Sequence, residues 1–131
     1  METVTGHLVW DVKMDFTRKA RWVLDGHLTP DIIGSIYAGV VSRESVRIAF
    51  TYAALKDVDI CAADIRNAYL QAPLSQKDFI ICGPKFGLEN VGKCALIHRA
   101  LYGSKSAGAD FRNQLRSCMT HLDCVSYPSG P

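Results

Sequence analysis

The chain has 131 residues, of which 48% are hydrophobic and 21% are charged. These values are ordinary for a globular protein and argue against intrinsic disorder, and the length suits one domain or part of a larger one. The net charge of +2 is too small to identify a nucleic-acid partner by itself.

The first predicted element is a β-hairpin. Large apolar residues alternate over residues 7–14, Asp15 and Phe16 interrupt them, and a second extended run follows over residues 17–24. Asp25-Gly26 then breaks the strand. Basic residues gather near the tip of this hairpin and along its second strand.

A helix is predicted next, after a segment over residues 27–41 that we interpret as mostly loop. Ser42 is a suitable N-cap, and Glu44 is favourable in the first turn. Apolar residues then recur at helical spacing, which predicts an amphipathic helix over about 43–56. Its apolar positions are Val46, Ala49, Phe50, Ala53 and Ala54.

Short apolar runs predict three further strands, over residues 58–65, 78–82 and 94–98. A second helix is predicted over residues 106–122. One face of it would carry Phe111, Leu115, Cys118, Met119 and Leu122. This order of elements gives an α+β fold and not a repeated βαβ unit. No glycine-rich dinucleotide loop or phosphate-binding P-loop is present in the sequence.

The five cysteines are an odd number, and they contain no Cys-x-x-Cys pair. We therefore expect free thiols in a reducing, intracellular setting. Cys118, His121 and Cys124 are spaced for one helix face, but three ligands without a fourth indicate zinc only weakly, and buried cysteines are the favoured interpretation. No apolar run approaches the roughly 20 residues that a membrane span requires, so we expect no membrane partner.

Basic residues outnumber acidic ones between residues 93 and 122, where Asp110 is the sole acid. The basic residues are Lys93, Arg99, Lys105, Arg112 and Arg116. Such a stretch can neutralise phosphates, although a solvated helix face is the favoured interpretation on charge alone.

Asp64 is the acidic residue of greatest chemical interest. It lies at the end of the apolar run over residues 58–65. A carboxylate at the end of a buried strand can project into a cleft and bind a hard cation such as Mg²⁺. An aspartate that caps the following turn is the simpler interpretation, and it is favoured on these residues alone.

Five blocks of the sequence match one family in order and spacing. They are RKARWV at residues 18–23, the predicted helix before Asp64, DIRNAYLQAPL at 64–74, FIICGPKF at 79–86 and ALYGSKS at 100–106. Together they resemble the reverse transcriptases of copia-type retrotransposons, over about residues 7–127. The first catalytic motif of that family is an Asp with an aromatic residue five positions later, which Asp64 and Tyr69 match.

The resemblance implies partial fingers over about residues 1–30 and 79–101. It implies partial palm regions over about residues 31–78 and 102–131, with an incomplete palm sheet. The complete enzyme transfers a nucleotide from a dNTP to a primer 3′-hydroxyl on an RNA or DNA template, using two Mg²⁺ ions. By resemblance, the catalytic Asp64 would bind both ions, the backbone carbonyl of Ile65 would bind the nucleotide-bound ion, and Tyr69 would exclude a 2′-hydroxyl.

The resemblance also implies a nucleotide-binding set. Lys19 and Arg21 would bind the triphosphate, because ammonium and guanidinium groups suit phosphate oxygens. Tyr102 and Gly103 would line the nucleotide pocket, and Lys105 would lie near the template strand. The simpler alternatives are that Arg21 is an ordinary exposed strand residue, that Tyr69 is a core residue, and that Tyr102-Gly103 is a strand–helix turn.

The sequence departs from the family pattern in one important respect. The second catalytic motif is an aromatic residue, any residue and then Asp-Asp, and no Asp-Asp pair occurs here. Ser104 and Gly108 also replace a usual Leu and a frequent Pro. We therefore expect a fragment that lacks the remainder of its polyprotein, is inactive alone, and resides in a cytoplasmic particle or the nucleus. The alternatives are a non-catalytic nucleic-acid-binding remnant or an inert retrotransposon relic.

Overall fold

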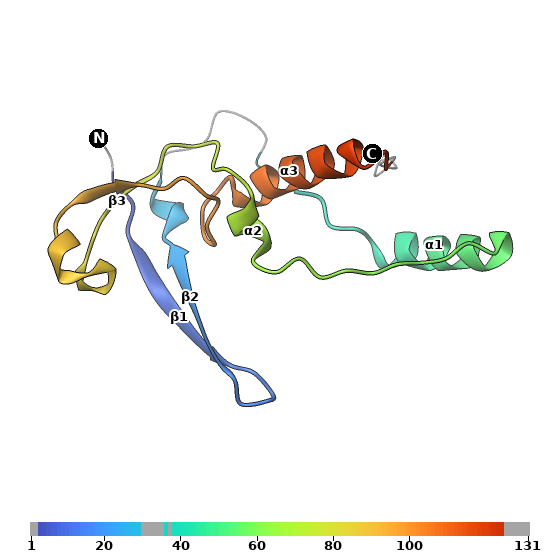
Figure 1. Cartoon of the computed structure of the whole chain (residues 1–131), viewed down its shortest axis with the longest axis horizontal. Coiled ribbons are helices and arrows are strands. Elements are labelled where there is room, and N and C mark those ends of the chain that lie inside the picture. Colours follow the sequence, from blue (N-terminus) through green and yellow to red (C-terminus); the bar gives the residue numbers. More distant parts are fainter. Residues whose placement is uncertain (1–2, 30–35, 37, 125–131) are drawn as a thin grey trace.

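The computed structural model describes residues 3–29, 36 and 38–124, and the predicted α+β class is confirmed. Its helices are α1 (Arg43–Lys56), α2 (Ala68–Gln71) and α3 (Ala107–His121). The strands form two separate antiparallel pairs. In Figure 1 the β1–β2 hairpin and α1 project in different directions from the region that holds α2, β3 and the start of α3.

The first hairpin consists of β1 (Gly6–Val12) and β2 (Arg18–Leu24), as the alternation predicts. Leu8 pairs with Trp22 and Val12 with Arg18, so these residues share one face of the hairpin. The turn depends on Asp15, whose Oδ1 accepts a hydrogen bond from the Thr17 backbone N–H at 3.0 Å. That backbone hydrogen bond also lowers the pKa of the exposed Asp15 carboxyl.

The second hairpin consists of β3 (Phe79–Ile81) and β4 (Cys94–Leu96), which are shorter than the predicted runs. Two 3-10 turns, Pro84–Phe86 and Leu88–Asn90, connect them. The Val4 backbone N–H donates to the Phe79 carbonyl at 2.7 Å, and this bond ties β3 to the segment that leads into β1.

Helix α1 occupies the predicted residues and begins at the predicted cap. The Ser42 side chain accepts a hydrogen bond from the Ser45 backbone N–H at 3.0 Å, which satisfies one of the unpaired donors of the first turn. Asp57, with a φ of 51°, ends the helix. The predicted apolar face is not a buried face, however, because Ala53 is the sole buried residue of α1.

The predicted strand over residues 58–65 is wrong. The structure places no strand there, and every side chain in the segment is exposed. A strand forms only where a second strand satisfies its backbone groups. The two described sheets pair β1 with β2 and β3 with β4, and this segment pairs with neither of them.

Two small apolar clusters hold the folded part together. Val4, Leu24 and Ile80 form the first, with Trp22 packed against it. The second is built from small side chains, Ala72, Ala100 and Ala107, and the aromatic rings of Tyr69 and Phe111 pack on it. A backbone hydrogen bond also links two segments of this second cluster. The Ala100 N–H donates to the Ala72 carbonyl at 3.0 Å.

Helix α3 has the predicted extent, but most of its predicted apolar face is exposed. Phe111 is half-buried, whereas Met119 and Leu122 are exposed. The interpretation of Cys118 and Cys124 as buried cysteines is also wrong, since both are exposed. In the part of the chain that is described, no helix has the length and apolar character needed to cross a membrane.

Candidate nucleotide-binding site

The turn before α3 lies directly against the end of the first hairpin. The Leu24 backbone N–H donates to the Tyr102 carbonyl at 2.8 Å. Gly103 has a φ of 87°, and a Cβ at this position would overlap the Leu24 carbonyl oxygen. A Cβ on Gly26 would likewise overlap the Gly103 carbonyl. Two glycines therefore allow backbone to approach backbone where β2 meets the turn.

Three aromatic rings and one cation meet beside this turn. The ring centroids of Tyr69 and Tyr102 lie 5.0 Å apart, and those of Tyr69 and Phe111 lie 6.0 Å apart. The guanidinium carbon of Arg21 is 5.8 Å from the centroid of the Tyr102 ring. These separations suit tilted aromatic packing and a cation–π contact. We call these four residues the Arg21–Tyr102 cluster.

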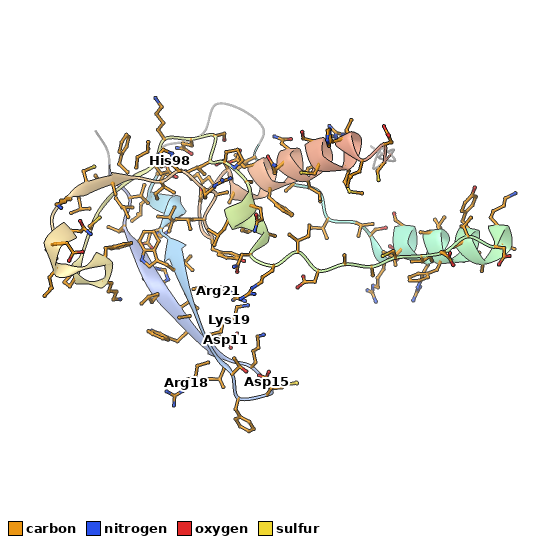
Figure 2. The ribbon with its side chains drawn as sticks, in the orientation of Figure 1. Asp11, Asp15, Arg18, Lys19, Arg21 and His98 are labelled. Atoms are coloured by element: carbon orange, nitrogen blue, oxygen red, sulfur yellow. The ribbon has the colours of Figure 1, made fainter. Side chains whose placement is uncertain are left out.

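Strand geometry explains how Arg21 reaches the cluster. Arg21 and Lys19 lie two residues apart on β2 and so share a face, opposite to that of Arg18. Figure 2 shows the Arg18 side chain on one side of the hairpin and the Lys19 and Arg21 side chains on the other. The Nε of Arg21 is buried and has no hydrogen-bond partner among the described residues. A buried donor without a partner is the kind of group that a bound anion satisfies.

The Lys105 side chain is held close to the Arg21–Tyr102 cluster by a backbone carbonyl group. Its Nζ donates to the Thr29 carbonyl at 2.6 Å, and the Thr29 hydroxyl in turn donates to the Gly26 carbonyl at 2.6 Å. This places the predicted template residue at the same junction as Gly103. The junction thus collects Arg21, Tyr69, Tyr102, Gly103 and Lys105 from three separate segments of the sequence.

Asp64 and Ile65 are not brought into this cluster. Both are exposed, and they lie in the extended segment that leads from α1 to α2. Within residues 3–29, 36 and 38–124, no three His, Cys, Asp or Glu side chains lie close enough to share a metal ion. Lys19 lies on the same face of β2 as Arg21, but the cation–π contact with the Tyr102 ring is made by Arg21.

Sequence reasoning missed several residues of this region. Helical spacing places Phe111 on a helix face but does not indicate its contact with the Tyr69 ring, and around Thr29 the sequence indicates only a loop. Asp78 was missed entirely: it is 3% exposed, and burial raises the pKa of its carboxyl, an effect that the nearby Ser104 hydroxyl opposes. A signal for Asp78 was present, since an acid opening an apolar run must be either solvated at the strand end or buried with a polar neighbour.

Asp110 is a further buried acid, and the sequence analysis considers it only as the one acidic residue between residues 93 and 122. Its Oδ2 accepts a hydrogen bond from the Ser75 backbone N–H at 3.2 Å, so the carboxylate fastens the segment after α2 to α3. No sequence signal pointed to this bond, because the two residues lie far apart in the chain.

Comparison with known proteins gives the family. The family model described as reverse transcriptase (RNA-dependent DNA polymerase) matches residues 4–127, which is nearly the whole chain. No solved structure gives a match. Enzymes of this family copy a nucleic-acid template from nucleoside triphosphates and generally use divalent metal ions. The chain therefore belongs to the reverse transcriptase (RNA-dependent DNA polymerase) family.

Proposed function

We propose that the chain carries the fingers and the first part of the palm of a copia-type reverse transcriptase, and that the Arg21–Tyr102 cluster is its dNTP-binding site. The observation that carries the proposal is the packing of Arg21 and Tyr69 against the same Tyr102 ring. The guanidinium carbon of Arg21 lies 5.8 Å from the centroid of this ring, and the centroid of the Tyr69 ring lies 5.0 Å from it. These three residues come from three separate family-like blocks. A guanidinium cation suits the oxygens of a triphosphate, and aromatic rings commonly line the pockets that bind small molecules.

The roles within the site follow from chemistry. Arg21, whose Nε lacks a partner among the described residues, would bind the triphosphate, with Lys19 on the same face of β2 as a second cation. Tyr69 would lie against the sugar and reject a 2′-hydroxyl. Gly103 would let the turn that carries Tyr102 pack directly against β2, since a Cβ there would overlap the Leu24 carbonyl oxygen. Lys105 would lie beside the template.

A separate question is whether Asp64 and Ile65 could hold the two metal ions. Two divalent ions about 3.5–4 Å apart need several oxygen ligands in register. Asp64 and Ile65 offer one carboxylate and one carbonyl, and the described part of the chain adds no cluster of further ligands. These residues do not fit a two-metal centre. We therefore propose that the chain binds dNTP and does not by itself join it to a primer.

The first experiment measures dNTP binding by calorimetry. We expect wild-type chain to bind a dNTP, Arg21→Gln to bind it at least several-fold more weakly, and Tyr69→Ala to lose the preference for dNTP over rNTP. Arg47→Gln is the matched control, since it removes the same charge from an exposed position on α1. Equal binding by wild type and Arg21→Gln would refute the site.

The second experiment measures primer extension on an RNA template with Mg²⁺. We expect no extension by the wild-type chain. Extension that Asp64→Asn abolishes and Asp59→Asn preserves would overturn the proposed inactivity, and it would assign catalysis to Asp64. Salt-sensitive nucleic-acid binding without dNTP binding would favour a non-catalytic binding remnant.

A further inference from the structure

A small surface hollow lies between α3 and the segment that follows α2. Its volume is about 250 Å³, which is below the roughly 300–1,000 Å³ of pockets that hold drug-sized ligands. The hollow therefore suits one small chemical group and not a nucleotide. It is lined from the two sides by Pro73, Leu74 and Ser75 and by Asp110, Asn113 and Gln114.

Asp110 gives the hollow its charge. The residue is 8% exposed, and its Oδ2 accepts the Ser75 backbone N–H at 3.2 Å, so the carboxylate lies against a second residue of the lining. Among the described residues, the Oδ1 of this carboxylate accepts no hydrogen bond, and no cationic side chain forms an ion pair with it. A buried carboxylate is costly unless donors or a cation satisfy it. Oδ1 is thus the atom that a ligand in the hollow would bind.

The other polar groups of the lining favour a ligand with several hydrogen-bond donors. The Gln114 Nε2 donates to the Cys118 Sγ at 3.6 Å, which leaves the Gln114 side-chain carbonyl as an acceptor for the hollow. Ser75 and Asn113 each add a side-chain oxygen that can also accept. The six lining residues include no lysine, arginine or histidine. The hollow therefore attracts cations and opposes anions such as a phosphate.

The lining suits an organic cation better than a metal ion. Asp110 is the one carboxylate of the hollow, and the part of the chain that is described contains no group of three ligands for a metal. A guanidinium group carries five N–H donors in one plane, so it can reach several separate acceptors. It is also more weakly hydrated than an ammonium group. Pro73 and Leu74, which offer no side-chain hydrogen bonds, can therefore lie beside it and pack on an alkyl arm.

We propose that this hollow binds an alkylguanidinium group, with the guanidinium at Asp110 and Gln114 and its alkyl arm against Pro73 and Leu74. The side chain of an arginine in a peptide and a free alkylguanidine share this chemistry. The hollow has no residue in common with the Arg21–Tyr102 cluster, and its negative charge opposes the phosphates of a dNTP. This site is therefore independent of the proposed dNTP site.

The test follows the backbone amide resonance of Ser75 by NMR, because this N–H is bonded to the carboxylate that would bind the ligand. We expect N-acetyl-arginine methylamide to shift the resonance in a saturable way. The uncharged analogue N-acetyl-citrulline methylamide should leave it unchanged, and N-acetyl-lysine methylamide should bind more weakly than the arginine compound.

Butylguanidinium, which lacks a peptide backbone, distinguishes the two sources of the ligand. Affinity equal to that of the arginine compound would show that the guanidinium and its arm are sufficient. Tighter binding of the arginine compound would identify an arginine within a peptide as the ligand. Both results support an alkylguanidinium site.

Two variants change the charge of the hollow in opposite directions. Asp110→Asn removes the charge but keeps an oxygen for the Ser75 N–H, and it should bind at least about tenfold more weakly, as expected for loss of one charge-assisted hydrogen bond. Gln114→Glu adds a second carboxylate and should bind several-fold more tightly. Asp123→Asn is the matched control, since it removes the same charge from an exposed position just after α3, where a φ of 56° suits asparagine. It should bind like wild type.

Four results contradict a guanidinium site at Asp110. They are the absence of a saturable shift up to the solubility limit of the arginine compound, equal binding of the citrulline compound, equal binding of the lysine compound, and an Asp110→Asn affinity within about twofold of wild type. Weaker binding by Asp123→Asn with unchanged binding by Asp110→Asn would assign the cation to the end of α3 instead. If Asp110→Asn does not fold, Gln114→Glu decides, because unchanged affinity in that variant also contradicts the site.

Discussion

The guanidinium group of Arg21 lies over the ring of Tyr102, with 5.8 Å between the guanidinium carbon and the ring centroid. The two residues come from β2 and from the turn before α3, and the bond from the Leu24 N–H to the Tyr102 carbonyl holds those segments in place. This contact brings residues of two separate sequence blocks together at one surface.

The first prediction concerns the Tyr102 ring. Tyr102→Phe keeps the π-face under Arg21, whereas Tyr102→Ala removes it and frees the guanidinium to rotate. A cation–π contact contributes roughly 0.5–1 kcal/mol at a partly exposed site. We expect dNTP affinity to fall several-fold in Tyr102→Ala and to change little in Tyr102→Phe, as measured by calorimetry. A loss of equal size in both variants would show that the hydroxyl, and not the ring, is what matters.

The second prediction concerns Gly103. Gly103→Ala places a Cβ at a φ of 87° and against the Leu24 carbonyl, so it combines conformational strain with overlap. Positive φ alone costs about 1–2 kcal/mol in a residue with a side chain. We expect a loss in unfolding free energy clearly larger than that, measured by urea denaturation.

Two other glycines separate these contributions. Gly92→Ala meets no atom within 4 Å but has a φ of 80°, so it should show the conformational cost alone. Gly83→Ala has an ordinary φ and open space around it, and should be neutral or slightly stabilising. Equal effects at Gly92 and Gly103 would show that β2 and the turn can move apart without loss.

The third prediction concerns Asp78 and pH. Burial raises the pKa of this carboxyl, so the folded protein binds its proton more tightly than the unfolded chain does. The charged form therefore costs stability above the folded-state pKa, and this cost shrinks as pH falls toward the unfolded value. We expect the difference in unfolding free energy between Asp78→Asn and wild type to favour the variant more at pH 7 than at pH 4. A pH-independent difference would contradict the raised pKa.

Much of the local structure was predictable because its causes are local. The hairpin follows from the alternation on either side of Asp15, and α1 begins at Ser42 because that hydroxyl accepts from the Ser45 N–H. The segment over residues 58–65 was not predictable in the same way. Its β-branched and apolar residues favour an extended chain, but a strand also needs a partner, and the segment pairs with neither described sheet.

The candidate site was predictable in part for a similar reason. The resemblance selected Arg21, Tyr69 and Tyr102, and the structure brings these three together. Their contacts with Phe111 and the burial of Asp78 depend on how distant segments pack. No periodicity in the sequence reports such packing.

The fourth prediction concerns the cap of α1. Ser42→Ala removes the acceptor for the Ser45 N–H and should destabilise the helix by about 1 kcal/mol. Because Ala53 is the sole buried residue of α1, tertiary contacts add little compensation. We expect faster hydrogen exchange over residues 43–56 in Ser42→Ala, and wild-type exchange in β1 and β2. Ser42→Asp should restore slow exchange, since it is also a good cap, whereas uniform loss of protection in both variants would mean that α1 and the hairpin unfold together.

The fifth prediction concerns the exposed segment over residues 58–65. Its backbone is extended and its apolar side chains face solvent, so two copies could pair along it. In the antiparallel register that joins Val58 to Ile65, Asp59 of one copy lies opposite Asp64 of the other, and this repulsion opposes association. We expect Asp59→Asn and Asp64→Asn each to raise light scattering at a given protein concentration, and Ile60→Lys to lower it. Scattering that is unchanged in all three variants would show that this segment does not drive association. Any effect of Asp64→Asn on primer extension would then not be caused by altered association of the protein.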